Sequence, residues 1–127
     1  MGIDMKKLLS IAVLGLSLVS LNAMAHGAAK PQHGGVVQAV SDLSFELVAQ
    51  ANGAAIYVVD HDDAADVSKM GGKLTALNGA EKSEAELKPV GGNKLEATGI
   101  QVAKGSKVVA SVAGVQGKTV TVRFSVK

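Results

Sequence analysis

The chain has 127 residues, 47% hydrophobic side chains and a formal net charge of +2 at pH 7. That length is enough for one domain with a single core. Cysteine is absent, which excludes disulfides, thiolate metal sites and thiol nucleophiles. One tyrosine and two phenylalanines are too few for a platform on which bases stack, so nucleic acid is not an expected partner.

The first 25 residues have the pattern of a secretory signal peptide. Lys6 and Lys7 form a short positive segment, and residues 8–21 are almost wholly apolar. Ala23 and Ala25 then place small residues at the two positions that a signal peptidase reads. The apolar run is shorter than the roughly 20 residues that span a bilayer. We therefore predict a signal-peptide helix, cleavage after Ala25 and no membrane insertion of the product.

Removal of this leader leaves a nearly neutral chain. From residue 26 onward, 11 Lys and Arg side chains stand against 10 Asp and Glu side chains. Such a balance gives no reason to expect nucleic acid or an anionic membrane as a partner. We predict a soluble periplasmic protein, with secretion out of the cell as the lesser alternative.

The exported part begins with a segment that has no hydrophobic periodicity. Residues 26–35 therefore predict a flexible N-terminal arm, and residues 36–127 a single β-domain. The first predicted strand of that domain is Val36 to Val40. Residues 41–50 follow with a period of two, which is typical of a half-buried strand. Its apolar face holds Leu43, Phe45, Leu47 and Ala49, and its polar face Ser44, Glu46 and Gln50.

The next segment reads as the second half of a hairpin. Asn52-Gly53 predicts a two-residue turn, because both residues tolerate positive φ. Residues 54–59 form a more continuous apolar run, as expected of a strand that is covered on both faces. Asp60-His61-Asp62-Asp63 ends this run with the densest charge in the chain. Residues 64–70 predict a loop or a single helical turn.

Five further strands are expected toward the C-terminus. They are Lys73 to Leu77, Ser83 to Lys88, Lys94 to Thr98, Lys107 to Ala113 and Lys118 to Val126. Turns between strands are predicted at Asn78-Gly79, Gly91-Gly92-Asn93, Lys104-Gly105 and Gly114 to Gly117. About eight short strands with glycine-rich turns and no helical period beyond the leader indicate an all-β fold. We predict an antiparallel β-sandwich of immunoglobulin-like type, with a small β-barrel as the alternative.

The residues offer little for catalysis. The serines lie on strands or turns without the elbow motif that presents a nucleophile. The Gly-Gly pairs precede no predicted helix, so they make no phosphate cradle. We therefore predict a protein that is not an enzyme and has no organic cofactor.

The three histidines are the main chemical signal, because imidazole is the commonest protein ligand for exported copper, zinc or nickel. Cleavage after Ala25 would make His26 the N-terminal residue, with an α-amine of unperturbed pKa roughly 7.7–8.0. Its amine and imidazole can then chelate one ion, which Cu(II) favours, with His33 as a candidate second imidazole. The alternative is that His26 is an arbitrary residue behind a cleavage site and His33 a turn residue.

His61 has the stronger local setting. It lies among Asp60, Asp62 and Asp63, and an imidazole with carboxylates suits Cu(II), Zn(II) or Ni(II). The alternative is an ordinary acidic, solvated loop. If the first three strands form a simple meander, His33 and His61 lie at opposite ends of the sheet, roughly 20 Å apart. The arm is long enough to bring His26 toward His61.

Several segments of the chain together resemble one group of proteins. They are Pro31-Gln32-His33-Gly34-Gly35, Phe45 to Val48, Ile56 to His61, Leu87-Lys88-Pro89, Gly92 to Leu95 and Val122-Arg123-Phe124. The group consists of small periplasmic β-sandwich proteins related to domains attached to adaptor (membrane fusion) subunits of heavy-metal efflux systems. The resemblance implies a role in metal handling, with His33, Asp60 and His61 as ligands and an efflux component as partner.

The sequence therefore predicts a periplasmic protein that binds copper or another divalent cation and sequesters or delivers it. The candidate ligands are His26, His33, Asp60, His61, Asp62 and Asp63. The alternative from another functional class is an envelope protein–protein interaction module without a ligand of its own.

Overall fold

The computed structural model describes residues 29–127, and this part of the chain is all-β. Its strands are β1 (Val36–Val40), β2 (Leu43–Gln50), β3 (Gly53–Asp60), β4 (Asp63–Ala64), β5 (Gly71–Asn78), β6 (Glu81–Pro89), β7 (Lys94–Thr98), β8 (Lys107–Val115) and β9 (Lys118–Ser125). Within these residues no helix is long and apolar enough to cross a membrane. The predicted signal peptide and His26 lie outside the described residues.

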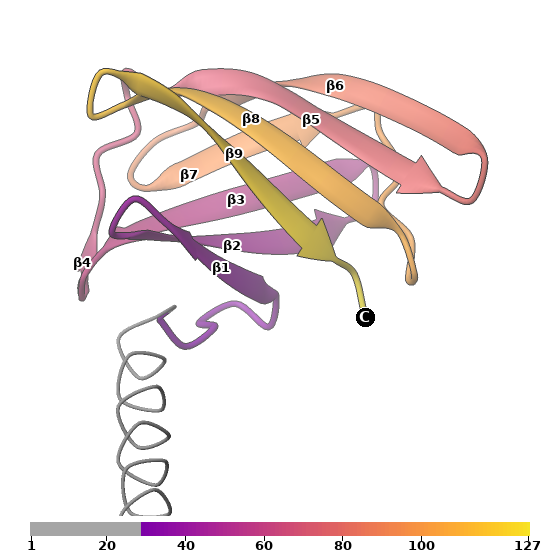
Figure 1. Cartoon of the computed structure of the whole chain (residues 1–127), viewed down its shortest axis with the longest axis horizontal. Coiled ribbons are helices and arrows are strands. Elements are labelled where there is room, and N and C mark those ends of the chain that lie inside the picture. The colour runs from indigo at the N-terminus through magenta and orange to yellow at the C-terminus, as the bar shows by residue number, and fades with distance from the viewer. Residues whose placement is uncertain (1–28) are drawn as a thin grey trace, which may run out of the picture.

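The strands form one antiparallel sheet that curls into two layers. The order is β1-β2-β3-β7-β6-β5-β8-β9, and β4 pairs with the end of β3. β6 connects the layers, because Leu87 and the residues before it pair with β5, whereas Lys88 and Pro89 pair with β7. β1 and β9, the two ends of this order, contact each other without ladder pairing (Figure 1). The sheet is therefore nearly closed as a barrel.

The predicted all-β antiparallel fold is confirmed. An immunoglobulin-like sandwich is not confirmed, because one hydrogen-bonded order runs through the strands of both layers. The alternative of a small barrel is closer to the structure. The predicted meander of the first three strands is confirmed, since Val36 pairs with Leu47 and Leu43 with Asp60. The bounds predicted for β1 and β7 are those observed.

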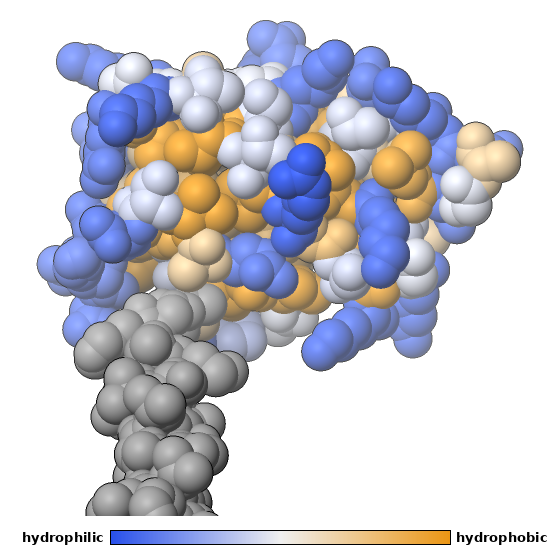
Figure 2. Space-filling model, in the orientation of Figure 1, coloured by the Kyte–Doolittle hydropathy of each residue, from blue (hydrophilic) through white to orange (hydrophobic). Residues whose placement is uncertain are grey.

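The core lies between the two layers and is built from alternate residues of the strands. Its largest fully buried side chains on strands are Phe45, Ile56, Leu74, Leu87 and Leu95. β9 keeps the predicted period of two, with Val120, Val122 and Phe124 buried and the residues between them exposed. Figure 2 shows apolar side chains reaching the surface on the face where β1 and β9 meet. β1 and β9 are in contact along this seam but are not paired in the strand order, so the barrel is not closed there.

Two hairpin turns lie one residue away from their predicted positions. Gln50 pairs with Gly53, so the turn is Ala51 and Asn52, and Gly53 already belongs to β3. Asn78 likewise pairs with Glu81, so Gly79 and Ala80 form that turn. A Cβ added at Gly53 would clash with the carbonyl oxygen of Ala97 on β7. This glycine is therefore required by the close pairing of β3 with β7.

We expect Gly53→Ala to lower the free energy of unfolding by more than about 2 kcal/mol, because the added methyl group forces β3 and β7 apart. Gly79→Ala is the matched control, since its φ is +64° but its Cβ would meet no atom within 4 Å. The control should cost only about 1 kcal/mol, from backbone strain alone. Urea unfolding followed by circular dichroism measures both changes, and equal losses would contradict the close approach.

Candidate functional site

The Asp60–Asp63 segment forms the turn between β3 and β4. Asp60 ends β3, Asp63 begins β4, and the two are paired directly across the turn. His61 follows Asp60 with a φ of +61°. Its Nδ1 atom lies 3.5 Å from Oδ1 of Asp60, and the two side chains are 70% and 53% exposed. An imidazole and a carboxylate thus lie side by side and are open to solvent.

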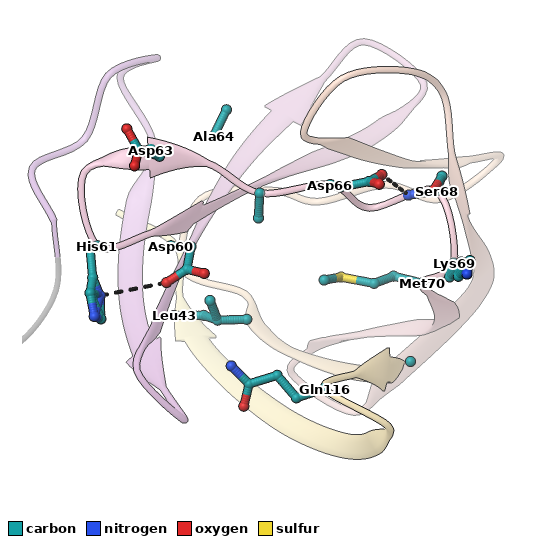
Figure 3. Close-up of a pocket in the computed structure, with 12 residues that line it drawn as sticks. Leu43, Asp60, His61, Asp63, Ala64, Asp66, Ser68, Lys69, Met70 and Gln116 are labelled. Atoms are coloured by element: carbon teal, nitrogen blue, oxygen red, sulfur yellow. Dashed lines mark hydrogen bonds and ion pairs between the residues drawn. The ribbon is translucent and has the colours of Figure 1, made fainter.

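This turn borders an open hollow of about 550 Å³ at one end of the barrel. Figure 3 shows the Asp60 carboxylate and the Met70 side chain directed into it from opposite walls. Met70 also packs against the core. Asp66 accepts a hydrogen bond from the backbone N–H of Ser68 at 2.9 Å, which lowers the pKa of its carboxyl group. The Asp66 carboxylate is therefore already engaged locally.

Within residues 29–127, no group of three or more His, Asp and Glu side chains is arranged to hold a metal ion. Asp60 and His61 are two of the predicted ligands that lie next to each other. Asp63 is the cross-strand neighbour of Asp60, and Asp62 lies between His61 and Asp63 in the turn. An ion held by Asp60 and His61 needs further donors, which water can supply.

His33 lies away from this turn. Its ring stacks on Tyr57, with ring centroids 3.6 Å apart and an angle of 5° between the planes. Because the segment before β1 folds back over β2 and β3, His33 lies level with Tyr57, four residues before His61. That offset is roughly 13 Å along an extended strand, and not the roughly 20 Å expected from the sequence. The imidazole of His33 is used within the fold.

Glu46 lies beneath His33, and the alternation of residues 41–50 predicts it on the polar face of a half-buried strand. It is only 5% exposed. Its Oε2 atom accepts hydrogen bonds from the backbone N–H groups of His33 and Gly35, both at 2.8 Å. Its Oε1 atom accepts one from the N–H of Gln32 at 3.0 Å and lies 3.2 Å from Nδ1 of His33. We call Glu46 and these donors the Glu46 clamp.

The clamp holds the described part of the segment that was predicted to be a flexible arm. A further hydrogen bond joins the N–H of Ala29 to Oγ of Ser44 at 2.9 Å. Residues 29–35 are therefore attached to the outer face of β2. The sequence signal for this is the Gly34-Gly35 pair, since Gly34 has a φ of +74° and the backbone N–H groups around it, of Gln32, His33 and Gly35, enclose the Glu46 carboxylate.

The electrostatics of Glu46 follow from these contacts. Burial raises the pKa of its carboxyl group, because the charged form loses solvation. Hydrogen bonds from the backbone of Gln32, Gly35 and His33 and from the His33 ring lower it more, so the pKa lies below its ordinary value. The carboxylate is ionised at neutral pH and stabilises the folded chain in that form.

A scan against protein-family models and searches of curated proteins and of solved structures found no match to this chain. A functional assignment therefore depends on the geometry and chemistry of the residues described above.

We expect Glu46→Gln to lower the free energy of unfolding at pH 7 by about 2 kcal/mol, because an amide leaves buried N–H donors poorly satisfied. The folded pKa of Glu46 is lower than its unfolded value of roughly 4.3. Its stabilisation is therefore complete above that value and is lost as the pH falls through the folded pKa.

Urea unfolding of the wild type and of Glu46→Gln at a series of pH values between 7 and 3 measures this effect. The difference in stability between the two proteins should narrow as the medium becomes acidic. Glu86→Gln is the control, since the Glu86 side chain is 71% exposed and its loss should leave stability nearly unchanged. A difference that stays constant down to pH 3 would contradict the role of the ionised carboxylate.

Proposed function

We propose that this protein is a periplasmic metal-binding protein that sequesters or delivers copper or another divalent cation, linked to heavy-metal efflux, and is not an enzyme. The observation that carries the proposal is the exposed pair of Asp60 and His61, with Nδ1 and Oδ1 3.5 Å apart at the mouth of an open hollow. Its export to the periplasm rests on the signal-peptide pattern of residues 1–25.

The chemistry of the pair suits a divalent ion. Imidazole nitrogen with carboxylate oxygen is a donor set that Cu(II), Zn(II) and Ni(II) accept. Asp62 and Asp63 add negative charge next to the pair, which favours a cation over long range. Because imidazole must be deprotonated to bind a metal, binding weakens in acid.

The exposure of the pair is consistent with transfer of an ion. An ion that keeps open coordination positions can be approached by the ligands of a second protein before it leaves the first. A closed four-ligand site, as in structural zinc sites, does not allow this. We therefore propose delivery to an efflux component as the partner reaction.

One observation favours the alternative function of an interaction module without a ligand. The edge of β6 that faces β7 is paired only at Lys88 and Pro89, so the preceding residues present free backbone groups. Val90, at the end of this edge, is 50% exposed. An extended segment of a partner protein can add to such an edge as a further strand.

The metal-binding function is tested by calorimetric titration of protein that begins at His26 with Cu(II), Zn(II) and Ni(II). We expect at least one ion to bind more tightly than millimolar, and His61→Ala to weaken that binding by about tenfold or more. His33→Phe is the control, because the phenyl ring keeps the stack on Tyr57 and His33 takes no part in the proposed site.

Titrations that detect no binding of Cu(II), Zn(II) or Ni(II) would contradict the proposal. If the protein binds none of these ions but co-purifies with a stoichiometric partner protein, the result would support the interaction module instead. An equal loss of affinity in His61→Ala and His33→Phe would contradict the assignment of the site to the β3–β4 turn.

A further inference from the structure

The edge of β6 that faces β7 is open along most of its length. Residues 81–87 pair with β5 on one side, whereas on the other side only Lys88 and Pro89 are paired within residues 29–127. We propose that two copies of this chain dimerise by antiparallel pairing of their β6 strands about a two-fold axis at Ser83. The proposal does not depend on the metal function, since the groove beside this edge and the hollow beside Asp60 share no lining residue.

The open edge is accessible to another strand. In Figure 1, β6 runs along the outside of the layer that it forms with β5, β8 and β9. β6 and β7 diverge beyond their short ladder, because Leu87 and Ala97, the next residues in register, are not paired. An open groove of about 360 Å³ lies between the two strands, and Ala85 and Thr98 are among the residues that line it. Unpaired backbone N–H and C=O groups along such an edge are a template for a further strand.

The symmetry of a dimer leaves few registers for this pairing. Residues that lie opposite each other in an antiparallel ladder point to the same face of the sheet. A two-fold axis perpendicular to the sheet must therefore place one residue opposite itself. For a ladder of at least five residues from each chain within residues 81–87, the axis lies at Ser83, Glu84 or Ala85.

The position of β7 favours the first of these registers. An axis at Ala85 brings the start of the second copy's β6 level with Lys88 and Pro89, where β7 is already paired. An axis at Glu84 brings the β5–β6 turn of the second copy to the same level. With the axis at Ser83, that turn stops short of Lys88. Only this register leaves the pairing of β6 with β7 undisturbed.

The charges favour the same register. The outer face of β6 carries Lys82, Glu84 and Glu86, which are all exposed. With the axis at Ser83, Lys82 lies opposite Glu84 of the second copy, and the symmetry repeats this pair. An axis at Glu84 gains a pair of Lys82 with Glu86 but opposes the Glu84 carboxylate to itself. An axis at Ala85 opposes Glu84 to Glu86, and like charges directly opposite each other destabilise a sheet.

In the Ser83 register the charges around the axis form one network. Within each chain, Nζ of Lys82 lies 3.5 Å and Nζ of Lys73 lies 3.4 Å from Oε2 of Glu84. Across the axis, each Glu84 gains the Lys82 of the other copy at the spacing of directly opposed residues, about 5 Å between Cβ atoms. Such a network of alternating charges contributes more than an isolated exposed pair. The two Ser83 hydroxyl groups meet at the axis on the other face of the sheet, where they can form a hydrogen bond.

The ladder is short, so the dimer is a weak one. We expect a monomer–dimer equilibrium with a dissociation constant of about 1 mM or tighter. The dimer fraction should fall as salt is added, because the charge pairs at the edge are exposed. Sedimentation equilibrium of the complete chain, over a series of protein and salt concentrations, measures both effects.

The charge register is tested by mixing two single variants of the complete chain. Lys82→Glu opposes two carboxylates across the axis, and Glu84→Lys opposes two ammonium groups. Each variant alone should therefore dimerise about tenfold more weakly than the wild type, whereas an equal mixture should form heterodimers about as tightly as the wild type dimerises. Recovery in the mixture also shows that both variants are folded. Glu86→Lys is the matched control and should leave dimerisation unchanged within about twofold, because residue 86 lies outside the paired charges.

The position of the axis is tested with an introduced cysteine, because the chain has none of its own. Ser83→Cys places two thiols directly opposite each other, with Cα atoms about 4.5–5.5 Å apart, a separation that a disulfide accepts. We expect mild oxidation to convert this variant into a covalent dimer. Glu81→Cys is the matched control on the same face of the same strand, because its two copies would lie about 13 Å apart along the ladder.

A wild-type protein that stays monomeric up to about 1 mM would overturn the second copy as the occupant and leave the edge to a segment of another protein. A dimer that Lys82→Glu and Glu84→Lys leave unchanged would overturn the pairing through β6. Cross-linking of Glu81→Cys as fast as Ser83→Cys would overturn the axis at Ser83. None of these results alters the metal titrations, so the failure of one proposal is distinguishable from the failure of the other.

Discussion

The ionised carboxylate of Glu46 is the constraint on which the arrangement of the N-terminal segment depends. A buried charge is costly unless hydrogen bonds replace its lost solvation. Here the donors are the backbone N–H groups of Gln32, His33 and Gly35 and the His33 ring. These residues carry no apolar pattern that would hold them against the barrel. Glu46 therefore fixes residues 32–35 on β2, and the hydrogen bond from Ala29 to Ser44 and the stack of His33 on Tyr57 add to this attachment.

The clamp also explains an asymmetry in the sheet. Leu43 to Leu47 are all buried, although the sequence alternates between apolar and polar side chains. The inner face of this part of β2 packs in the core, and its outer face is covered by residues 29–35. In β9, where no such cover lies on the outer face, alternate residues from Val120 to Ser125 are exposed. Among the described residues, the segment 29–35 thus adds a cover over the outer face of β2, and Val59 near the end of β3 lines the small cavity beneath it.

Sequence patterns were sufficient for features that depend on local chemistry. The period of two identified β9, and the acidic residues identified the turn at Asp60. The turn predicted at Asn52-Gly53 lies one residue earlier in the structure. Residues that tolerate positive φ indicate that a turn is near, but the pairing of the two strands sets the register and hence the position of the turn. Alternation indicates which face of the sheet a residue occupies, but it does not indicate which strand lies beside it. The strand order, and with it the nearly closed barrel, could therefore not be derived from the sequence. The burial of Glu46 could not be predicted, because the residues that cover it belong to a segment without hydrophobic periodicity.

The two described histidines have acquired different roles through the same geometry. His33 is committed to Glu46 and Tyr57 and contributes to the attachment of the segment. The Nδ1 atom of His61 lies 3.5 Å from the Asp60 carboxylate, and the His61 side chain remains 70% exposed.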